Sequence, residues 1–481
     1  MNTSAPQTRV LEMQAKLHQW AGENEARRFD DLYNLVCDPT FLREGWLRVK
    51  GNKGGRTAGV DGITVEHVQR MIGEEQFLAD LREDLKKQRF RPLPVRQRMI
   101  PKANGKLRQL GIPTLRDRVV QATLKLVLEP IFEADFQPCS YGFRPNRRAQ
   151  DAIQEVVHLG NSTYLWVLEA DAEACFDNID QVALMERVRR RIKDKKILAL
   201  VKAFLKAGIL TELGQEQASY TGTPQGGILS PLLANIALSA LDNHFAKTWR
   251  EEMNTDYQRK KRRQNGSGVW RLIRYADDWV VMVSGSRANA EALREEVRAV
   301  VATIGLQLAE AKTRVVHLDE GFDFLGFRIQ RRFNRSTGRH VIHTRPSDKN
   351  RKGIREKVRT LTNRASRRTS ETLLRTLNRV LRGWCNYFRH GVVKRIFQEL
   401  DWFTQRRVSK WIRRRHQRHH PISWTEYKRR FLRRHGRRWD ITVRGNTLYR
   451  PAHVPVTRYR YRGTRIPTPW TPSNLQPRPD G

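Results

Sequence analysis

The fold is decided by the stretch VWRLIRYADDWVVMVS, residues 269–284. Two apolar runs, residues 269–273 and 280–283, flank the tetrapeptide Tyr275-Ala276-Asp277-Asp278. Short apolar runs on both sides of a polar turn predict a β-hairpin, which places two carboxylates at its tip. A turn is needed, because neighbouring side chains on a strand point to opposite faces. Taken alone, two aspartates in a turn are also explained by local hydrogen bonding.

A further carboxylate is predicted at the end of an earlier strand. Residues 164–171 form a short apolar run that ends at Asp171, and the chain continues as Ala172-Glu173-Ala174-Cys175-Phe176-Asp177. Two divalent cations held close together need hard oxygen ligands, and Asp171 with Asp277 supplies the minimum. Such a pair of ions activates a primer 3′ hydroxyl and stabilises a leaving pyrophosphate. The two segments together therefore predict a site for nucleotidyl transfer.

The composition predicts a polyanionic partner. The 481 residues include 91 Lys and Arg against 50 Asp and Glu, which gives a formal net charge of +41. Phosphate neutralisation and counterion release supply most of the affinity of such surfaces for nucleic acid. A merely solubilising charge and an anionic membrane are the alternatives. No run approaches the roughly 18 apolar residues that a spanning helix needs, so we expect no membrane partner and a cytoplasmic protein.

The coarse pattern along the chain alternates helices with short strands. A basic, polar linker is expected at residues 259–268, and an extended arm rich in Pro, Arg and Tyr from Arg450 onwards. A cationic hairpin is expected around residues 101–111. Periodicity predicts helices at residues 8–35, 66–87, 118–132, 182–192, 229–249 and 287–304, strands at 95–100, near 315 and at 324–330, and three or four helices between 347 and 434.

Three segments carry a resemblance to a known class of polymerase. The pattern Asp-x-x-x-x-Phe-Asp at residues 171–177, TPQGGILSP at 223–231 and YADD at 275–278 resemble, in order and spacing, the polymerase blocks of reverse transcriptases. Within that class, GVDG at 59–62, RQLGIP at 108–113 and SYGFRP at 140–145 resemble group II intron proteins. The resemblance covers residues 52–415.

This resemblance implies an α+β fold of the right-hand polymerase type, with fingers, a ferredoxin-like palm, a helical thumb and a basic, mainly helical C-terminal extension. It implies an N-terminal helical extension with a basic loop at residues 1–62. Fingers and palm would occupy 63–346, and the thumb, or maturase domain, 347–420. The basic extension at 421–481 would bind RNA or DNA, because its cations are interleaved with aromatic residues.

Carried over residue by residue, the resemblance assigns the catalytic group. Asp171 and Asp277 would bind two Mg²⁺ ions, with Asp278 as an auxiliary carboxylate and the Ala172 backbone carbonyl as a further oxygen ligand. Lys312 matches a late lysine of the family, which could protonate pyrophosphate as a general acid. A simple phosphate contact is the alternative for Lys312.

The resemblance also assigns nucleotide contacts, in which Ala172 takes part. Phe176 would close the sugar pocket against a 2′ hydroxyl and favour deoxynucleotides, with a core phenylalanine as the alternative. Gln225 would lie against the incoming nucleotide, and Lys102 and Arg108 would hold its triphosphate.

A primer grip is expected at Phe324-Leu325-Gly326, where glycine allows close approach of the backbone to nucleic acid. A buried strand with a glycine bulge has the same geometry. In the thumb region, Leu373, Leu377, Leu381 and Trp384 share one helical stripe, which is more typical of a core than of a binding face.

The implied function is that of an RNA-directed DNA polymerase of a group II intron, which also assists splicing as a maturase and takes part in intron mobility. Its implied partners are group II intron RNA, an RNA template with a DNA primer, target DNA and deoxynucleoside triphosphates. No C-terminal nuclease of the His-Asn-His type is expected. Two alternatives stay open: a non-catalytic RNA-binding splicing factor, and a domesticated reverse transcriptase in defence or repair.

Overall fold

The computed structural model describes residues 6–101, 107–211, 215–217, 221–223, 226–363, 368–415, 422–435, 438–463 and 465–471. The chain divides into two compact units. The first unit comprises Met1–Val156, Trp166–Val315 and Arg462–Gly481, and the second comprises Val157–Leu165 and Val316–Tyr461. Among the described residues, no helix has the length and apolar character needed to cross a membrane. The predicted domain boundaries at residues 62, 346 and 420 stay predictions.

The N-terminal part of the first unit is built around helix α6 (Leu115–Asp135), which is buried along most of its length. Helices α1 (Pro6–Glu23), α2 (Tyr33–Val36) and α3 (Pro39–Gly51) pack on it. A Cβ on Gly45 of α3 would lie 2.4 Å from the Thr123 hydroxyl of α6, so the two helices cross closely. The helix predicted at residues 8–35 is thus two helices separated by a loop.

A second group of elements follows α3. Helix α5 (Glu74–Lys86) is separated from the short helix α4 (Val65–His67) and a π-turn at Val68–Ile72 by Gly73, whose φ of +89° ends the first segment. Strands β1 (Val95–Pro101) and β2 (Leu107–Ile112) form an antiparallel hairpin. The sheet runs in the order β2-β1-β4-β5, with β4 at Ile209–Leu210 and β5 at Glu216–Gln217.

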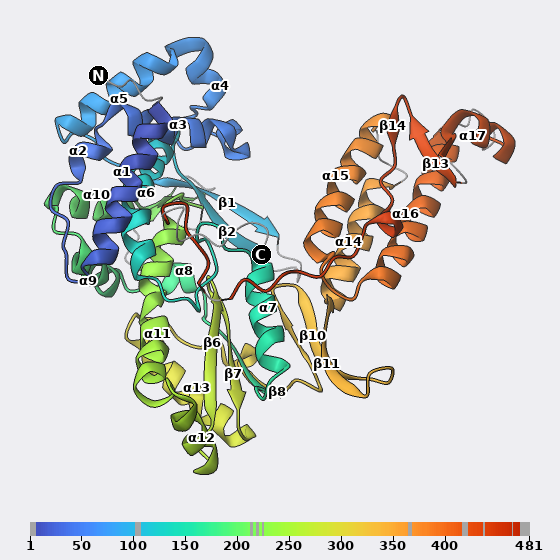
Figure 1. Cartoon of the computed structure of the whole chain (residues 1–481). Helices are drawn as coiled ribbons and strands as arrows, with labels where there is room; N and C mark the ends of the chain where they lie inside the picture. The colour runs from blue at the N-terminus through green and yellow to red at the C-terminus, as the bar shows by residue number, and fades with distance from the viewer. Residues whose placement is uncertain are drawn as a thin grey trace. The chain divides into compact units, whose positions relative to one another are not determined.

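The central sheet of the first unit has the strand order β6-β7-β3, followed by β8 (Arg314–His317). Strands β6 (Val269–Tyr275) and β7 (Asp278–Ser284) form the predicted hairpin, and β3 (Trp166–Asp171) pairs antiparallel with β7. Most residues of β7 are buried, because α11 (Ser230–Glu252) and α13 (Arg287–Ala302) pack against this part of the unit (Figure 1). Further helices of the first unit are α8 (Cys175–Asn178), α9 (Gln181–Arg191) and α10 (Lys195–Leu205), together with α7 (Ala149–Gly160), whose residues from Val157 onwards belong to the second unit.

The linker predicted at residues 259–268 is wrong for its first part. Helix α12 (Asp256–Gln264) covers it, and a capping box between Thr255 and Gln258 starts the helix. None of its residues is buried, so no apolar periodicity marks it in the sequence.

The second unit contains a three-stranded sheet and a helical group. The sheet has β9 (Phe322–Phe324), β10 (Phe327–Asn334) and β11 (Arg339–Pro346) in the order β11-β10-β9. The helices are α14 (Asp348–Leu361), α15 (Ser370–Phe388), α16 (Lys394–Arg415) and α17 (Trp424–Phe431). Leu373, Leu377 and Leu381 are fully buried in the helical core, and Trp384 packs against it, which confirms the predicted core stripe.

The expectation of a mainly helical C-terminal extension is wrong beyond α17. Strands β12 (Leu432–His435), β13 (Arg438–Val443) and β14 (Asn446–Thr447) form a three-stranded sheet. The sequence Trp439-Asp440-Ile441-Thr442-Val443 alternates apolar and polar residues, which favours a strand. Arg444 and Gly445 have φ values of 45° and 78° and form the tight turn into β14. The arm predicted from Arg450 onwards begins with a short 3₁₀ turn at Pro451–His453, and only the described residues 454–463 and 465–471 form no helix or strand.

Candidate active site

The β6-β7 hairpin and the end of β3 bring three carboxylates together. Asp171 and Asp278 are direct cross-strand partners, and Tyr275 pairs with Asp278 to close the hairpin. Directly opposed residues on antiparallel strands project to the same face, with Cβ atoms about 5 Å apart. Ala276, with φ of 57°, and Asp277 form the turn between these strands. The predicted group of Asp171, Asp277 and Asp278 therefore lies at one end of the sheet.

The carboxylates repel one another in the folded protein. Burial, and then the charge of Asp171, raise the pKa of Asp277. Burial, followed by the charges of Asp277 and Asp171, raises the pKa of Asp278 to about 6. Part of Asp278 nevertheless stays exposed to solvent, where a bound cation could reach it. The site therefore carries more negative charge than its surroundings neutralise.

Lys312 is the cation nearest to this group. Its ammonium contacts the Asp171 carboxylate, and this hydrogen bond raises the pKa of Lys312. The lysine side chain is 67% exposed. It is held in place by a short 3₁₀ turn at Glu310–Lys312, which follows the backbone bond from Ala309 to the Asp171 carbonyl.

The donor set fits magnesium. Mg²⁺ is usually held by one or two carboxylates together with substrate phosphates rather than by a complete protein cage. Among the described residues, no three His, Cys, Asp or Glu side chains lie close enough together to hold a metal ion, so the three aspartates share one end of the sheet without forming a complete protein cage. A cation bound here would relieve the burial and mutual repulsion that raise the pKa of Asp277 and Asp278. The Ala172 carbonyl is not used by the two backbone bonds beside it, from Glu173 to Gln307 and from Ala309 to Asp171.

Phe176 lies five residues beyond Asp171, near the start of α8, and is half-buried. Its carbonyl accepts a hydrogen bond from the Thr223 backbone at 2.6 Å. A Cβ on Gly222 would lie 2.5 Å from the Phe176 and Asp177 carbonyl oxygens. The segment that leads into the TPQGG motif therefore packs directly against the predicted sugar-pocket residue.

Arg108 lies on β2. Its positive charge partly offsets the rise in the pKa of Asp277 that burial and Asp171 cause. A Cβ on Gly226 would lie 2.3 Å from the Gly111 carbonyl oxygen, so the TPQGG segment also contacts β2. Lys102 and Gln225, the other predicted nucleotide contacts, lie outside the described residues. The nucleotide-binding roles of all these residues stay predictions.

The predicted primer grip belongs to the second unit. Phe324 ends β9, and Leu325 and Gly326 form the turn into β10 with φ values of 47° and 80°. The Tyr387 hydroxyl donates to the Leu325 carbonyl at 2.9 Å, and the Asn350 side chain donates to the Gly326 carbonyl at 3.2 Å. The turn is thus fixed from the helices of its own unit.

The support of the catalytic turn was not predicted from the sequence. The Arg274 side chain is fully buried and donates to Asp242 of α11 at 2.8 and 2.5 Å. It also donates to the Asn235 side chain, the Ala276 carbonyl and the Ser140 hydroxyl at 2.9, 2.9 and 2.7 Å. One arginine therefore links the C-terminal end of β6 to α11 and to the SYGFRP segment. The available signal was an arginine within a mostly apolar strand, but β6 also carries Arg271, so the sequence did not single out Arg274.

Gly142 of the SYGFRP segment lies against the same turn. A Cβ there would be 2.2 Å from the Ala276 backbone nitrogen. The Gly142 carbonyl accepts from Asn235 at 2.8 Å, and the Tyr141 backbone donates to the Arg274 carbonyl at 2.8 Å. Only glycine leaves room for this approach, which explains why the motif carries one here.

Two family models match the chain. Residues 100–329 match the reverse transcriptase (RNA-dependent DNA polymerase) model, and residues 351–436 match the group II intron, maturase-specific domain. The class is therefore a reverse transcriptase domain followed by a maturase domain.

Curated relatives agree with these matches. Protein YkfC of Escherichia coli K12 is 39% identical over 360 residues, which cover 71% of this chain and 93% of that protein. The group II intron-encoded protein LtrA of Lactococcus lactis subsp. cremoris is 32% identical over 376 residues, or 68% of this chain and 60% of LtrA. An uncharacterised 91 kDa protein in the cob intron of Schizosaccharomyces pombe is 28% identical over 444 residues, or 76% and 53%. The chain belongs to the family of group II intron-encoded reverse transcriptases and maturases.

A solved Candida albicans telomerase in complex with a fragment of telomeric RNA matches with a TM-score of 0.39 at 13% identity, covering 70% of this chain and 62% of that one. The chain spans about 60% of the length of LtrA.

Proposed function

We propose that the chain is an RNA-directed DNA polymerase that copies RNA into DNA, and that it assists intron splicing as a maturase and takes part in intron mobility. The observation that carries the proposal is the convergence of Asp171, Asp277 and Asp278 at one end of the central sheet, within the matched reverse transcriptase domain. All three carboxylates needed for a two-metal site are present in one unit. Maturase and mobility roles rest on the maturase-domain match.

Asp171, Asp277 and the Ala172 carbonyl would hold two Mg²⁺ ions, with Asp278 beside them. Bound Mg²⁺ supplies activation of the primer 3′ hydroxyl and charge stabilisation of the leaving pyrophosphate. A new bond then joins the 3′ oxygen to the α-phosphorus, and the bond from the α-phosphorus to the bridging oxygen breaks. Lys312 would give its proton to that oxygen, because its ammonium already lies at Asp171.

Substrate selection would use the elements around this group. Arg108 on β2 would hold the triphosphate, because its charge already acts on Asp277. Phe176, whose backbone packs against Gly222, would exclude a 2′ hydroxyl from the sugar pocket. Lys102 and Gln225 complete the proposed set.

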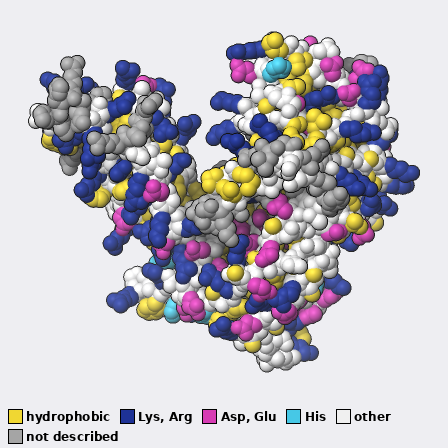
Figure 2. Space-filling model, turned by 180° about the vertical axis from the view of Figure 1, so that it is seen from behind, with side chains coloured by type: hydrophobic (Ala, Val, Ile, Leu, Met, Phe, Trp, Pro, Cys, Tyr) yellow, Lys and Arg dark blue, Asp and Glu magenta, His cyan; other side chains and the backbone are white. Residues whose placement is uncertain are grey.

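We assign the palm to the β6-β7-β3 sheet with its helices, the fingers to the β1-β2 hairpin and the N-terminal helices, and the thumb to α14, α15 and α16. The proposed partners are group II intron RNA, an RNA template with a DNA primer, target DNA and deoxynucleoside triphosphates. Lys and Arg side chains are spread over the surface shown in Figure 2, as expected for a chain with a net charge of +41. The cytoplasmic location stays a prediction.

The test is deoxynucleotide incorporation on an annealed RNA template and DNA primer with Mg²⁺, by wild-type protein and by the Asp277→Ala, Asp278→Ala double variant. RNA binding is measured on the same samples. Incorporation by wild type alone, with binding retained by both, supports the polymerase. Binding without incorporation by either protein would replace it with a non-catalytic splicing factor.

A further inference from the structure

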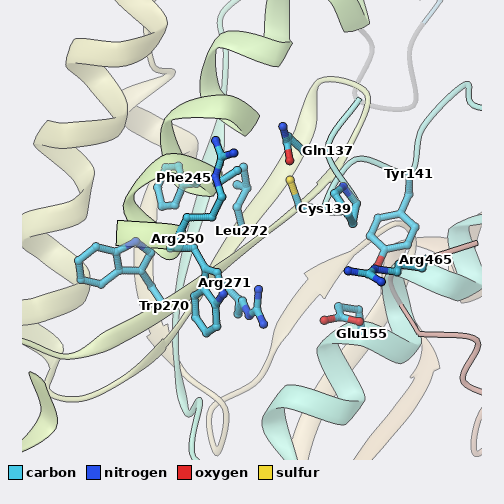
Figure 3. Close-up of a pocket in the computed structure, with 13 residues that line it drawn as sticks. Gln137, Cys139, Tyr141, Glu155, Phe245, Arg250, Trp270, Arg271, Leu272 and Arg465 are labelled. Atoms are coloured by element: carbon cyan, nitrogen blue, oxygen red, sulfur yellow. The ribbon is translucent and has the colours of Figure 1, made fainter. Parts of the chain in front are cut away.

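A cavity of about 350 Å³ lies in the first unit, away from the predicted catalytic residues. Its walls come from α7, the C-terminal end of α11, β6, the segment that precedes SYGFRP and the C-terminal arm (Figure 3). None of Asp171, Asp277, Asp278 and Arg108 lines it. Its volume falls in the range of small-ligand sites, which is about 300–1,000 Å³.

One wall offers a flat cationic surface. The guanidinium carbon of Arg271 lies 3.3 Å from the centroid of the Trp249 ring. The Tyr141 ring also lines the cavity but is fully buried, so stacking falls to Trp249, which is partly exposed. Unpaired bases of RNA stack on aromatic rings and on arginine guanidinium planes, so this wall suits a base.

The rim carries two arginines that have no carboxylate partner. Arg250 and Arg465 are exposed, and neither forms an ion pair with any residue that the structure describes. In Figure 3, Arg465 reaches into the cavity from the side opposite Arg271. A guanidinium without a partner is well suited to a phosphate, because its planar set of donors matches phosphate oxygens.

The arm that supplies Arg465 is anchored to α7. Arg462 donates to both carboxylate oxygens of Asp151, at 2.8 and 2.5 Å, and Ile466 is buried. Asp151 lies one helical turn before Glu155, which also lines the cavity. The contact between Arg462 and Asp151 therefore anchors the arm and with it the position of Arg465 beside Glu155.

The Glu155 carboxylate lets the cavity discriminate between bases. It is only 6% exposed and lies on the helix that anchors the arm. A carboxylate accepts hydrogen bonds from an exocyclic amino group, such as that of cytosine, whereas uracil presents a carbonyl oxygen at the same position. A base with an amino group would therefore be favoured here over uracil.

We propose that this cavity binds one unpaired nucleotide of an RNA strand, with its base against Trp249 and Arg271, its phosphate at Arg250 and Arg465, and cytosine preferred over uracil through Glu155. The inference rests on RNA binding by the chain, but not on its polymerase activity.

The test uses hexaribonucleotides that carry one 5-iodocytidine or one 5-iodouridine, crosslinked by light to the full chain. Crosslinked peptides are then identified by mass spectrometry, which separates this cavity from the rest of a basic surface. Peptides from the cavity wall that includes Trp249 are expected to be labelled, with iodocytidine favoured about fivefold or more. Labelling should persist in the Asp277→Ala, Asp278→Ala variant, so failure of the polymerase assay leaves this result intact.

Two variants test the assignment. Arg250→Ser with Arg465→Ser should lower labelling at these peptides about tenfold, since two charge-assisted phosphate contacts are lost. The matched control, Lys247→Ser with Arg287→Ser, removes two exposed cations outside the cavity and should leave labelling unchanged. Glu155→Gln should abolish the preference for cytidine. Equal loss in the two double variants, or labelling only at other peptides, would overturn the proposal.

Discussion

The guanidinium of Arg274 and the carboxylate of Asp242 form an ion pair inside the first unit, with neither side chain exposed to solvent. Arg274 ends the apolar part of β6 and Asp242 lies on α11, so the pair fixes the strand to the helix just before the catalytic turn. The same guanidinium also donates to the Ala276 carbonyl within that turn. This geometry makes Arg274 a positioning residue for Asp277 and Asp278.

Replacing Arg274 with methionine should reduce both stability and incorporation. Breaking a buried pair leaves Asp242 charged and unpaired, which costs about 3–5 kcal/mol. Denaturant unfolding measures the loss of stability, and single-turnover incorporation measures kcat separately from KM. We expect kcat to fall more than KM changes, because the turn is displaced while the nucleotide contacts remain.

The control is Arg191→Met, which removes a buried arginine that donates to the Ala21, Asn24 and Glu25 carbonyls. It should lower stability without a matching loss of kcat. If both variants lose incorporation in proportion to stability, Arg274 acts on folding alone.

Asp117 should make stability depend on pH. Burial raises the pKa of Asp117 to about 6, and its side chain accepts from Thr114 at 2.7 Å and from the Leu93 backbone at 3.3 Å. Between about pH 4 and 6 the folded state holds a proton that the unfolded state has lost, so stability falls as pH rises through this window. Asp117→Asn should therefore be more stable than wild type by about 1–3 kcal/mol at pH 7.5.

This advantage should shrink to nothing as the pH is lowered to about 4. Unfolding midpoints across pH 4–8 measure it. An equal gain at all pH values would assign the effect to packing, and the exposed Asp80→Asn variant of α5 should show no such trend.

Phe176→Val should admit ribonucleotides. If the ring excludes a 2′ hydroxyl, shortening it should reduce discrimination by about 1–3 kcal/mol, or roughly 5- to 150-fold in the ratio of kcat/KM values. Paired assays with dNTP and rNTP substrates give this ratio. Phe333→Val, which changes an exposed ring of β10, is the control. An unchanged ratio would make Phe176 a core residue.

The C-terminal arm should stabilise the first unit. Trp470 is 8% exposed, and its ring lies 5.5 Å from that of His18 in α1. Trp470→Ala should lower stability by about 3 kcal/mol, because a buried aromatic side chain is lost. Trp402→Ala, at a ring that is 62% exposed, should change stability little. Equal melting temperatures for wild type and Trp470→Ala would show that the arm does not contribute.

The catalytic hairpin could be predicted because its signals are local. Apolar runs on both sides of YADD specify two strands, and the apolar run before Asp171 specifies a third. The group of carboxylates follows once these strands pair. Helix α12 could not be placed, because it has no buried face. The alternation that marks β13 is present in the sequence, but it is short and lies within a highly basic segment, so the helical prediction for that segment missed it.

The support of the hairpin could not be predicted, because it joins residues that are distant in sequence. Nothing local shows that Arg274 pairs with Asp242. Nor does it show that the Gly142 backbone lies so close to Ala276 that a Cβ on Gly142 would be 2.2 Å from the Ala276 nitrogen. Motif resemblance identified SYGFRP and TPQGG as segments, but the reason for their glycines is tertiary. Gly142 admits the catalytic turn, and Gly226 admits the β2 backbone.

Lys312 offers the sharpest choice between two roles in the proposed reaction. As a general acid it should contribute about 10²–10⁴-fold to kcat, so Lys312→Ala should lower kcat by that factor with little change in KM. The side chain is 67% exposed, so the fold should tolerate the change. Lys312→Arg keeps the positive charge but does not release a proton near neutral pH. A general acid predicts that the arginine variant is as impaired as the alanine variant in single-turnover incorporation. Near-normal kcat for Lys312→Arg, with a raised KM only in Lys312→Ala, would instead make Lys312 a phosphate contact.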